Sequence, residues 1–289
     1  MMESWRRFWF RPGSTLPLEA CRILVGLALL FSYAGLSPWL LDLYGDGGWI
    51  PREVMRLDPQ IPWNQSIFFY LHQPWQWPLF HCVFLFSCAA FALGLGTRWV
   101  KWIVFFGHLS YIKRNPWAVY GADQLAASIL FILALAPIGR GSSAAPSSRA
   151  SACTRLMQIQ VTVIYLFSGL AKLRGEEWWC GDALWVVFHA FQFLNVAWVR
   201  WFAHHDWIVN LLSYGTLALE ITYPFFVWRK PTRRYWVAAA IALHLGIALA
   251  LRLYFFSALA IAGQLAFFPP ERLGVILGSC RKRRVGLHE

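Results

Sequence analysis

The run ACRILVGLALLFSYAGLSPWLLD occupies residues 20–42, and its charged side chains are Arg22 and Asp42. A helix needs about 20 mostly apolar residues to cross the hydrocarbon core of a bilayer, so this run predicts a transmembrane helix. Seven more apolar runs follow, at 77–97, 99–113, 121–139, 155–173, 208–228, 235–252 and 254–268. We therefore predict an all-α, multi-pass transmembrane helical bundle of about eight spans.

The composition separates this chain from ordinary soluble proteins. Hydrophobic residues make up 58% of the 289 positions and charged residues 14%, whereas soluble domains carry about 25% charged residues. The formal net charge is +12, but the Lys and Arg residues lie in short segments that flank the apolar runs. That placement is typical of topology signals and of contacts with anionic lipids. We therefore expect the lipid bilayer as a partner, and no nucleic acid.

The basic segments also predict an orientation. With eight spans, four basic groups fall on one side of the membrane, at 6–11, 140–155, 229–234 and 281–284. The positive-inside rule makes that side cytoplasmic, so we expect the inner (cytoplasmic) cell membrane, with both termini in the cytoplasm. A cleaved signal peptide is the alternative for the first run. Its apolar residues continue through 38–41, which favours a retained span.

No internal repeat and no second domain are visible in the sequence. The stretch GSSAAPSSRASA at 141–152 is the one flexible linker. We expect a single integral membrane domain over 1–289, with a core at about 15–273 and a basic cytoplasmic tail at 274–289.

A ninth apolar segment, 182–198, has a different pattern. His189, Gln192 and Asn195 recur every three residues along one side. This spacing predicts an amphipathic interfacial helix, or a re-entrant one, in addition to the eight spans.

Two further groups bear on metals and disulfides. His204, His205 and Asp206 are adjacent, but they lack the i, i+4 histidine spacing of a helical metal site, so we expect no metal there. Cys82 and Cys180 both fall on the predicted outer side, and the sequence leaves open whether they pair.

Two ionisable residues lie deep in predicted spans, where a charge is expensive. Glu220 and His244 are each about 12–14 Å from the inner ends of their spans at 1.5 Å per residue. The two spans are antiparallel neighbours, so we predict that the side chains meet as a hydrogen-bonded pair. Such a pair is either a proton relay or cofactor contact, or a buried pair that fixes helix register.

Lys172 closes the fifth apolar run, within YLFSGLAKLRGEEWW at 165–179. Apolar surroundings favour the neutral amine, which is the form that acts as a base. The alternative is a lysine that extends its amine from the helix end toward water.

Other charges also lie near the ends of the runs. Lys113 and Arg114 fall on the outer side, where Asp123 opens the fourth run and Arg252 closes the seventh. Positive charge on that side indicates an anionic substrate group or pairing with acids such as Asp123. Arg22 is expected to extend to the cytoplasm.

Several short motifs follow one another in a fixed order. They are Cys21-Arg22-Ile23 with Gly26, Tyr44-Gly45-Asp46-Gly47-Gly48, Leu93-Gly94-Leu95-Gly96-Thr97-Arg98, Tyr120-Gly121, Tyr165-Leu166-Phe167-Ser168-Gly169-Leu170-Ala171-Lys172-Leu173 with Trp179 and Gly181, the His244 helix, and Phe267-Phe268-Pro269-Pro270. Over about 15–273 the chain resembles the HTTM-domain family, which is related to vitamin K-dependent γ-carboxylase.

The resemblance implies a chemistry for Lys172. In the carboxylase the matching lysine is the base that deprotonates reduced vitamin K, so a reduced quinone is the implied cofactor and Lys172 the implied catalytic base. The supporting residues that we predict are Tyr120, Asp123, Tyr165, Trp179, Glu220, His244 and Arg252. The carboxylase has a catalytic His before its Tyr-Gly and a large outer domain after the bundle. Here the matching stretch is Asn115-Pro116-Trp117 and the chain stops at Glu289, so full γ-glutamyl carboxylation is not expected.

Three functions follow from these observations. The first is a quinol-linked or peptide-modifying membrane enzyme with Lys172 as base. The second is a non-catalytic membrane partner in the maturation or assembly of a small secreted peptide. The third is a proton-coupled transporter that uses Glu220 and His244.

Overall fold

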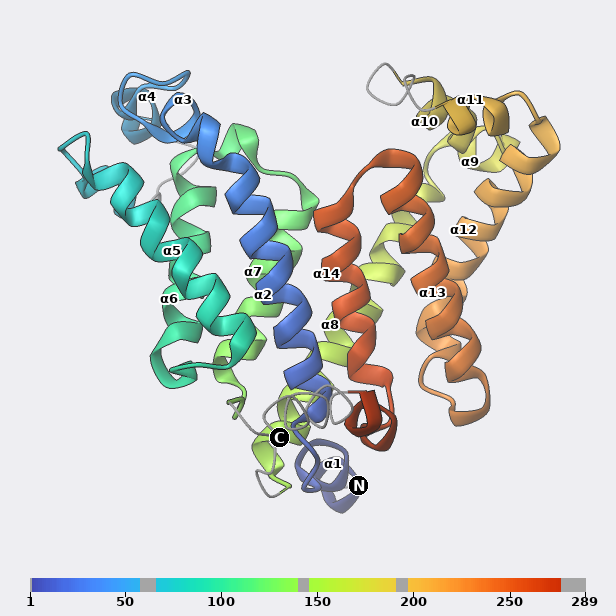
Figure 1. The fold of residues 1–289 in the computed structure, drawn as a ribbon. Helices are drawn as coiled ribbons and strands as arrows, with labels where there is room; N and C mark the ends of the chain where they lie inside the picture. The colour runs from blue at the N-terminus through green and yellow to red at the C-terminus, as the bar shows by residue number, and fades with distance from the viewer. Residues whose placement is uncertain (1, 58–65, 140–145, 191–196, 277–289) are drawn as a thin grey trace, which may run out of the picture. The chain divides into compact units, whose positions relative to one another are not determined.

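The computed structural model describes residues 2–57, 66–139, 146–190 and 197–276. Within these ranges the regular elements are helices, and the remaining β contact is one isolated bridge between Gly13 and Ser147. Every predicted apolar run overlaps a helix (Figure 1). These helices are α2 (Leu16–Leu36), α5 (Gln76–Leu93), α6 (Thr97–Arg114), α7 (Gly121–Leu135), α8 (Ser148–Lys172), α12 (Asp206–Phe226), α13 (Lys230–Leu251) and α14 (Tyr254–Gln264).

Short helices connect or follow the long ones. They are α1 (Met2–Phe10), η1 (Ser37–Trp39), α3 (Leu40–Tyr44), α4 (Arg52–Leu57), η2 (Ile67–Tyr70), η3 (Pro116–Ala118), α9 (Glu176–Cys180), α10 (Ala183–His189), α11 (Ala197–Ala203) and η5 (Leu265–Phe267). Through η1 and α3, the first apolar run extends helically to Tyr44.

Three segments of the described chain are long and apolar enough to cross a membrane: Leu16–Tyr44, Gln76–Leu93 and Lys230–Leu251. Two shorter apolar segments, Gly121–Leu135 and Tyr254–Phe267, fall below the usual spanning length. The all-helical fold is thus confirmed, whereas the predicted number of eight spans stays a prediction.

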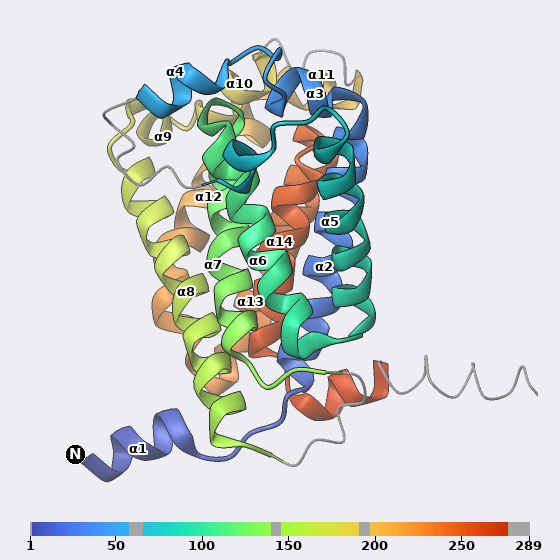
Figure 2. The same cartoon turned by 90° about the vertical axis from the view of Figure 1, so that its left-hand side faces the viewer.

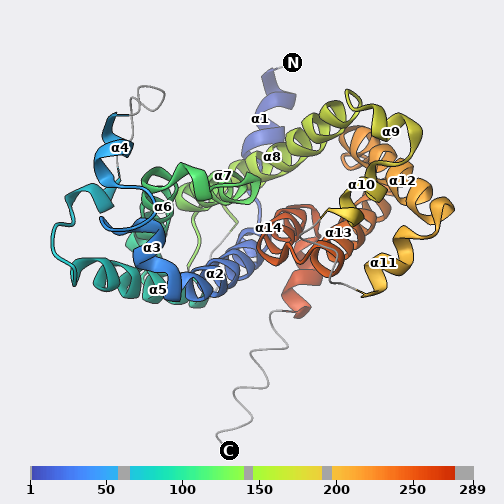
Figure 3. The same ribbon diagram turned by 90° about the horizontal axis from the view of Figure 1, so that it is seen from above.

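The chain divides into two compact units, Met1–Met157 with Phe268–Glu289, and Gln158–Phe267. In the first unit α2 packs against α5, α5 against α6, and α6 against α7, as the view from above shows (Figure 3). A Cβ at Gly26 would lie 2.9 Å from the Ala92 backbone. Glycine at this position therefore permits the close approach of α2 and α5.

Arg22 does not extend to the cytoplasm, so that expectation was wrong. Its side chain is buried, and its Nε lies 2.9 Å from Glu19 Oε2. Its Nη1 donates to the carbonyl oxygens of Phe91 and Ala92, at the C-terminal end of α5. A cation is stabilised at a helix C-terminus, and the arginine therefore ties α2 to the last turn of α5.

Glycines explain the turn between α5 and α6, which lies within the Leu93–Arg98 motif. Gly94 closes α5 with φ of 74°, and Gly96 precedes α6 with φ of 56°. Both angles are left-handed and suit glycine. After this turn α6 runs alongside α7 (Figure 2).

In the second unit α12 packs against α13, and α13 against α14. The short helices α9, α10 and α11 contact α12. The prediction of one continuous amphipathic helix over 182–198 was wrong. Helix α10 ends at His189, because Ala190 has an extended backbone with ψ of 134°. Gln192 and Asn195 lie outside the described residues.

Cys82 and Cys180 are both free, exposed thiols.

Candidate functional site

One face of α8 carries three polar side chains of the second unit. Tyr165, Ser168 and Lys172 are spaced three and four residues apart, and residues with that spacing lie above one another on a helix. The apolar residues between them point elsewhere, so the face is a narrow polar stripe along the otherwise apolar C-terminal part of α8, residues 163–172.

Lys172 is held by three neighbours. Its Nζ donates to Ser168 Oγ at 2.7 Å and to Glu220 Oε1 at 3.0 Å, and lies 2.8 Å from Glu220 Oε2. The amine also lies 5.2 Å from the centre of the Trp178 ring, within cation–π range. The Glu220 side chain is 10% exposed and that of Lys172 22%, so the ion pair is largely removed from solvent.

A glycine brings the two halves of this ion pair together. A Cβ at Gly169, three residues before Lys172, would lie 2.8 Å from Ile221 Cδ1 and 3.2 Å from the Ile221 backbone nitrogen. Without a side chain at this position, α8 and α12 approach closely, and Glu220 reaches the Lys172 amine.

The predicted hydrogen bond between Glu220 and His244 is not formed, so that prediction was wrong. Glu220 pairs with Lys172, and His244 Nε2 instead lies 2.9 Å from the hydroxyl of Tyr165. The register of α8 explains the difference, because Glu220 binds Lys172 whereas His244 binds Tyr165, seven residues earlier on the same polar stripe.

Two residues extend this network beyond His244. The ring of Tyr223 stacks on Tyr165 at 4.1 Å, and its hydroxyl donates to Gln264 Oε1 at 2.5 Å. Gln264 Nε2 donates in turn to the Tyr165 hydroxyl at 3.3 Å. Helices α8, α12, α13 and α14 therefore each contribute a polar side chain to one buried cluster.

Two polar atoms of the Lys172 cluster are buried without a hydrogen bond. Glu220 Oε2 is close to the Lys172 amine but receives no directed hydrogen bond, and His244 Nδ1 has no partner. Buried polar atoms are nearly always satisfied. A hydroxyl-bearing ligand would satisfy both atoms. Glu220 Oε2 would accept a hydrogen bond from it, and His244 Nδ1 would accept or donate one according to the tautomer of the histidine.

Residues 142–271 match the family model of the HTTM domain. This part of the chain is therefore similar to the HTTM domain. The matched region contains Tyr165, Lys172, Glu220 and His244, and together with the apolar helices the match indicates a membrane protein. Comparison with curated proteins and with solved structures gave no match.

Two predicted residues of the matched region lie away from the amine. Trp179 is exposed, and its indole nitrogen donates to the Leu173 carbonyl at 2.8 Å, whereas Trp178 is the ring beside Lys172. Arg252 is exposed and caps α13 in the left-handed conformation, with φ of 56°. Arg252 therefore has a structural role at the C-terminal end of α13.

Tyr120 and Asp123 lie in the first unit, before the HTTM match. The Asp123 carboxylate accepts from the Tyr120 backbone at 3.0 Å and so caps the start of α7. Partial burial, together with the nearby Asp123, raises the pKa of Tyr120 to about 12. This hydroxyl is therefore protonated at neutral pH and is not a base.

Arg114 also lies in the first unit, and it does not pair with Asp123. It is fully buried, and its Nη2 donates to the carbonyl oxygens of Gly45 and Ile50 at 2.8 and 3.0 Å. It thereby holds the Tyr44–Gly48 motif against the end of α6.

Sequence reasoning missed four residues of the cluster: Ser168, Trp178, Tyr223 and Gln264. The signal for two of them was helical spacing, because Ser168 is four residues before Lys172 and Tyr223 three residues after Glu220. Trp178 and Gln264 come from other elements, and their proximity depends on tertiary packing.

Proposed function

We propose that the HTTM domain is a membrane enzyme in which Lys172 and Glu220 together accept a proton from a hydroxyl group of a membrane-soluble, reduced quinone. The observation that carries this proposal is the ion pair itself, with Nζ 3.0 and 2.8 Å from the two Glu220 oxygens in a largely covered site. Glu220 Oε2, which receives no directed hydrogen bond although it lies 2.8 Å from Nζ, can also accept one from the ligand.

The Lys172–Glu220 ion pair can accept one additional proton. In the resting pair the amine is an ammonium and the acid a carboxylate. Lys172 passes a proton to Glu220 and takes the hydroxyl proton in its place, so that the pair ends as ammonium and carboxylic acid. The ammonium then lies beside the developing negative charge, where it is stabilising.

The remaining groups have positioning roles in this proposal. Ser168 holds the amine at 2.7 Å and Trp178 covers it. His244 Nδ1 is free to bind a second polar group of the ligand, while Tyr165 fixes the histidine ring through Nε2. A reduced quinone would supply an acidic hydroxyl group and two electrons for reaction with oxygen.

Oxygen uptake with reduced vitamin K tests this proposal. Protein in lipid nanodiscs should consume oxygen after phylloquinol is added, above the protein-free rate. Lys172→Arg keeps a positive charge next to Glu220 but is not a base, and should lower the rate at least 100-fold. The matched control is Lys230→Arg, an exposed lysine at the start of α13, which should leave the rate unchanged. Equal uptake in wild type and Lys172→Arg would contradict the proposal.

A non-catalytic role in the maturation of a small secreted peptide is the second proposal. The ion pair supports it as well, because the amine is already bonded to Ser168 and Glu220 and is stabilised as a cation. If a peptide copurifies with wild type and with Lys172→Arg alike, and oxygen uptake is absent from both, this second role stands.

The transporter hypothesis loses its motivation, since Glu220 and His244 are not directly bonded.

A further inference from the structure

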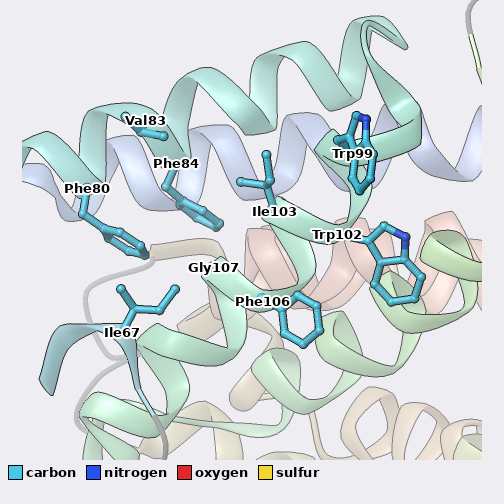
Figure 4. Close-up of a pocket in the computed structure, with 9 residues that line it drawn as sticks. All are labelled: Ile67, Phe80, Val83, Phe84, Trp99, Trp102, Ile103, Phe106 and Gly107. Carbon is cyan, nitrogen blue, oxygen red and sulfur yellow. The ribbon is translucent and has the colours of Figure 1, made fainter. Parts of the chain in front are cut away.

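A groove between α5 and α6 lies apart from the Lys172 cluster, in the first unit (Figure 4). Its volume is about 330 Å³. Phe84 is 1% exposed and forms the floor with the buried Gly107, while the exposed Val83 and Ile103 form the sides. Every lining residue is apolar or aromatic.

The hollow depends on a glycine. A Cβ at Gly107 would lie 2.5 and 2.6 Å from two ring carbons of Phe84. Glycine lets one edge of the Phe84 ring pack directly against α6 at the floor of the groove. Along α6 the lining runs from Trp99 to Gly107, about 12 Å at 1.5 Å per residue.

One end of the groove differs from the rest. Trp99 and Trp102 lie together at the α6 N-terminal end, as Figure 4 shows. The Arg98 guanidinium lies 5.6 Å from the centre of the Trp99 ring. Trp rings favour the level of the lipid headgroups, and a helix N-terminus and an arginine both attract anions there.

Positive charge at this end has no acidic neighbour on the two helices. Neither α5 nor α6 contains Asp or Glu, and Arg98 forms no ion pair with any residue that the structure describes. An apolar groove that ends at an uncompensated arginine is complementary to a molecule with an apolar chain and an anionic head.

We propose that the α5–α6 groove binds one anionic glycerophospholipid, with an acyl chain along Val83, Phe84 and Ile103 and the phosphate at Arg98. The apolar lining selects the chain, and Arg98 with the two tryptophans selects the charged head. This site is independent of proton transfer at Lys172.

Native mass spectrometry of the purified protein tests the proposal. After mixing with equal amounts of phosphatidylglycerol and phosphatidylcholine of the same chains, wild type should retain the anionic lipid about fivefold more, the ratio that one interfacial arginine supplies. Arg98→Gln should bring that ratio near one. Lys113→Gln, at the other end of α6, is the matched control and should keep it.

The chain-binding part needs a second pair of variants. Val83→Trp and Ile103→Trp each fill the groove from an exposed position and should remove the retained lipid. Leu79→Trp, exposed on α5 outside the groove, should not. Millimolar inorganic phosphate should fail to displace the lipid, because phosphate lacks the chain.

Each of the following results would overturn this site. They are equal retention of the two lipids by wild type, an unchanged ratio in Arg98→Gln, and undiminished lipid in both groove-filling variants. Displacement by inorganic phosphate would show a simple anion site in place of a lipid site, and would also overturn it. Circular dichroism and size-exclusion profiles that match wild type establish that each variant is folded.

Discussion

At the scale of single residues, two buried or part-buried charges of the long helices are held by specific partners. Arg22 pairs with Glu19 and the end of α5, and Lys172 pairs with Glu220. Depth within the predicted spans identified Glu220 and His244 as unusual, because charge is expensive in an apolar helix. Lys172 was identified by its apolar surroundings and its motif. It did not identify the partners, since a partner depends on which helix faces are packed together.

Arg22→Leu should destabilise the protein strongly. The change leaves the Glu19 carboxylate buried without its cation and the last carbonyls of α5 without a donor, and breaking a buried pair in this way costs about 3–5 kcal/mol. Arg7→Leu is the control, because the Arg7–Glu3 pair is exposed and should contribute about 0.5 kcal/mol or less. Thermal unfolding in detergent micelles measures both. Equal melting temperatures for the two variants would contradict the buried role of Arg22.

At the scale of the helices, hydropathy predicted the elements well and their junctions poorly. All eight apolar runs overlap helices, because a long apolar run satisfies its backbone groups most simply as a helix. The 182–198 segment was predicted by side-chain spacing alone, and spacing does not report the backbone break at Ala190. Close helix approach depends on single glycines, whose role is visible only when the neighbouring helix is known.

Gly169→Ala should destabilise the second unit, although alanine is the better helix former. The added methyl would press on Ile221, and overpacking of this kind costs about 1–3 kcal/mol. In Gly215→Ala, on α12, the new methyl has no atom within 4 Å. That control should be stabilised by about 0.5–1 kcal/mol. Melting temperatures that rise in both variants would rule out the close approach of α8 and α12.

At the scale of the whole molecule, the single integral membrane domain stays a prediction. The structure adds a division into two compact units, which falls within α8. The predicted site residues fall into both units: Tyr120 and Asp123 in the first, and Lys172, Glu220 and His244 in the second. A continuous apolar pattern carries no mark of such a division, because both units contain apolar helices of the same kind.

The orientation predicted from the basic segments is testable through native cysteines. Cys180 is exposed and lies in the segment predicted to be outside, while Cys153 is buried. In intact cells a membrane-impermeant maleimide should label Cys180 in a Cys82→Ser background, and Cys180→Ser should remove that label. Labelling of Cys180 only after the cells are opened would show that this segment faces the cytoplasm and would contradict the predicted orientation.

The central claim is that the Lys172–Glu220 pair takes up a proton from its ligand. Infrared difference spectroscopy measures this directly, because a protonated carboxylic acid has a carbonyl band that a carboxylate lacks. On anaerobic addition of phylloquinol to the protein in nanodiscs, the account predicts that this band appears in wild type and is absent in Glu220→Gln and Lys172→Met. A spectrum without the band in wild type, or with the same band in all three proteins, would contradict it.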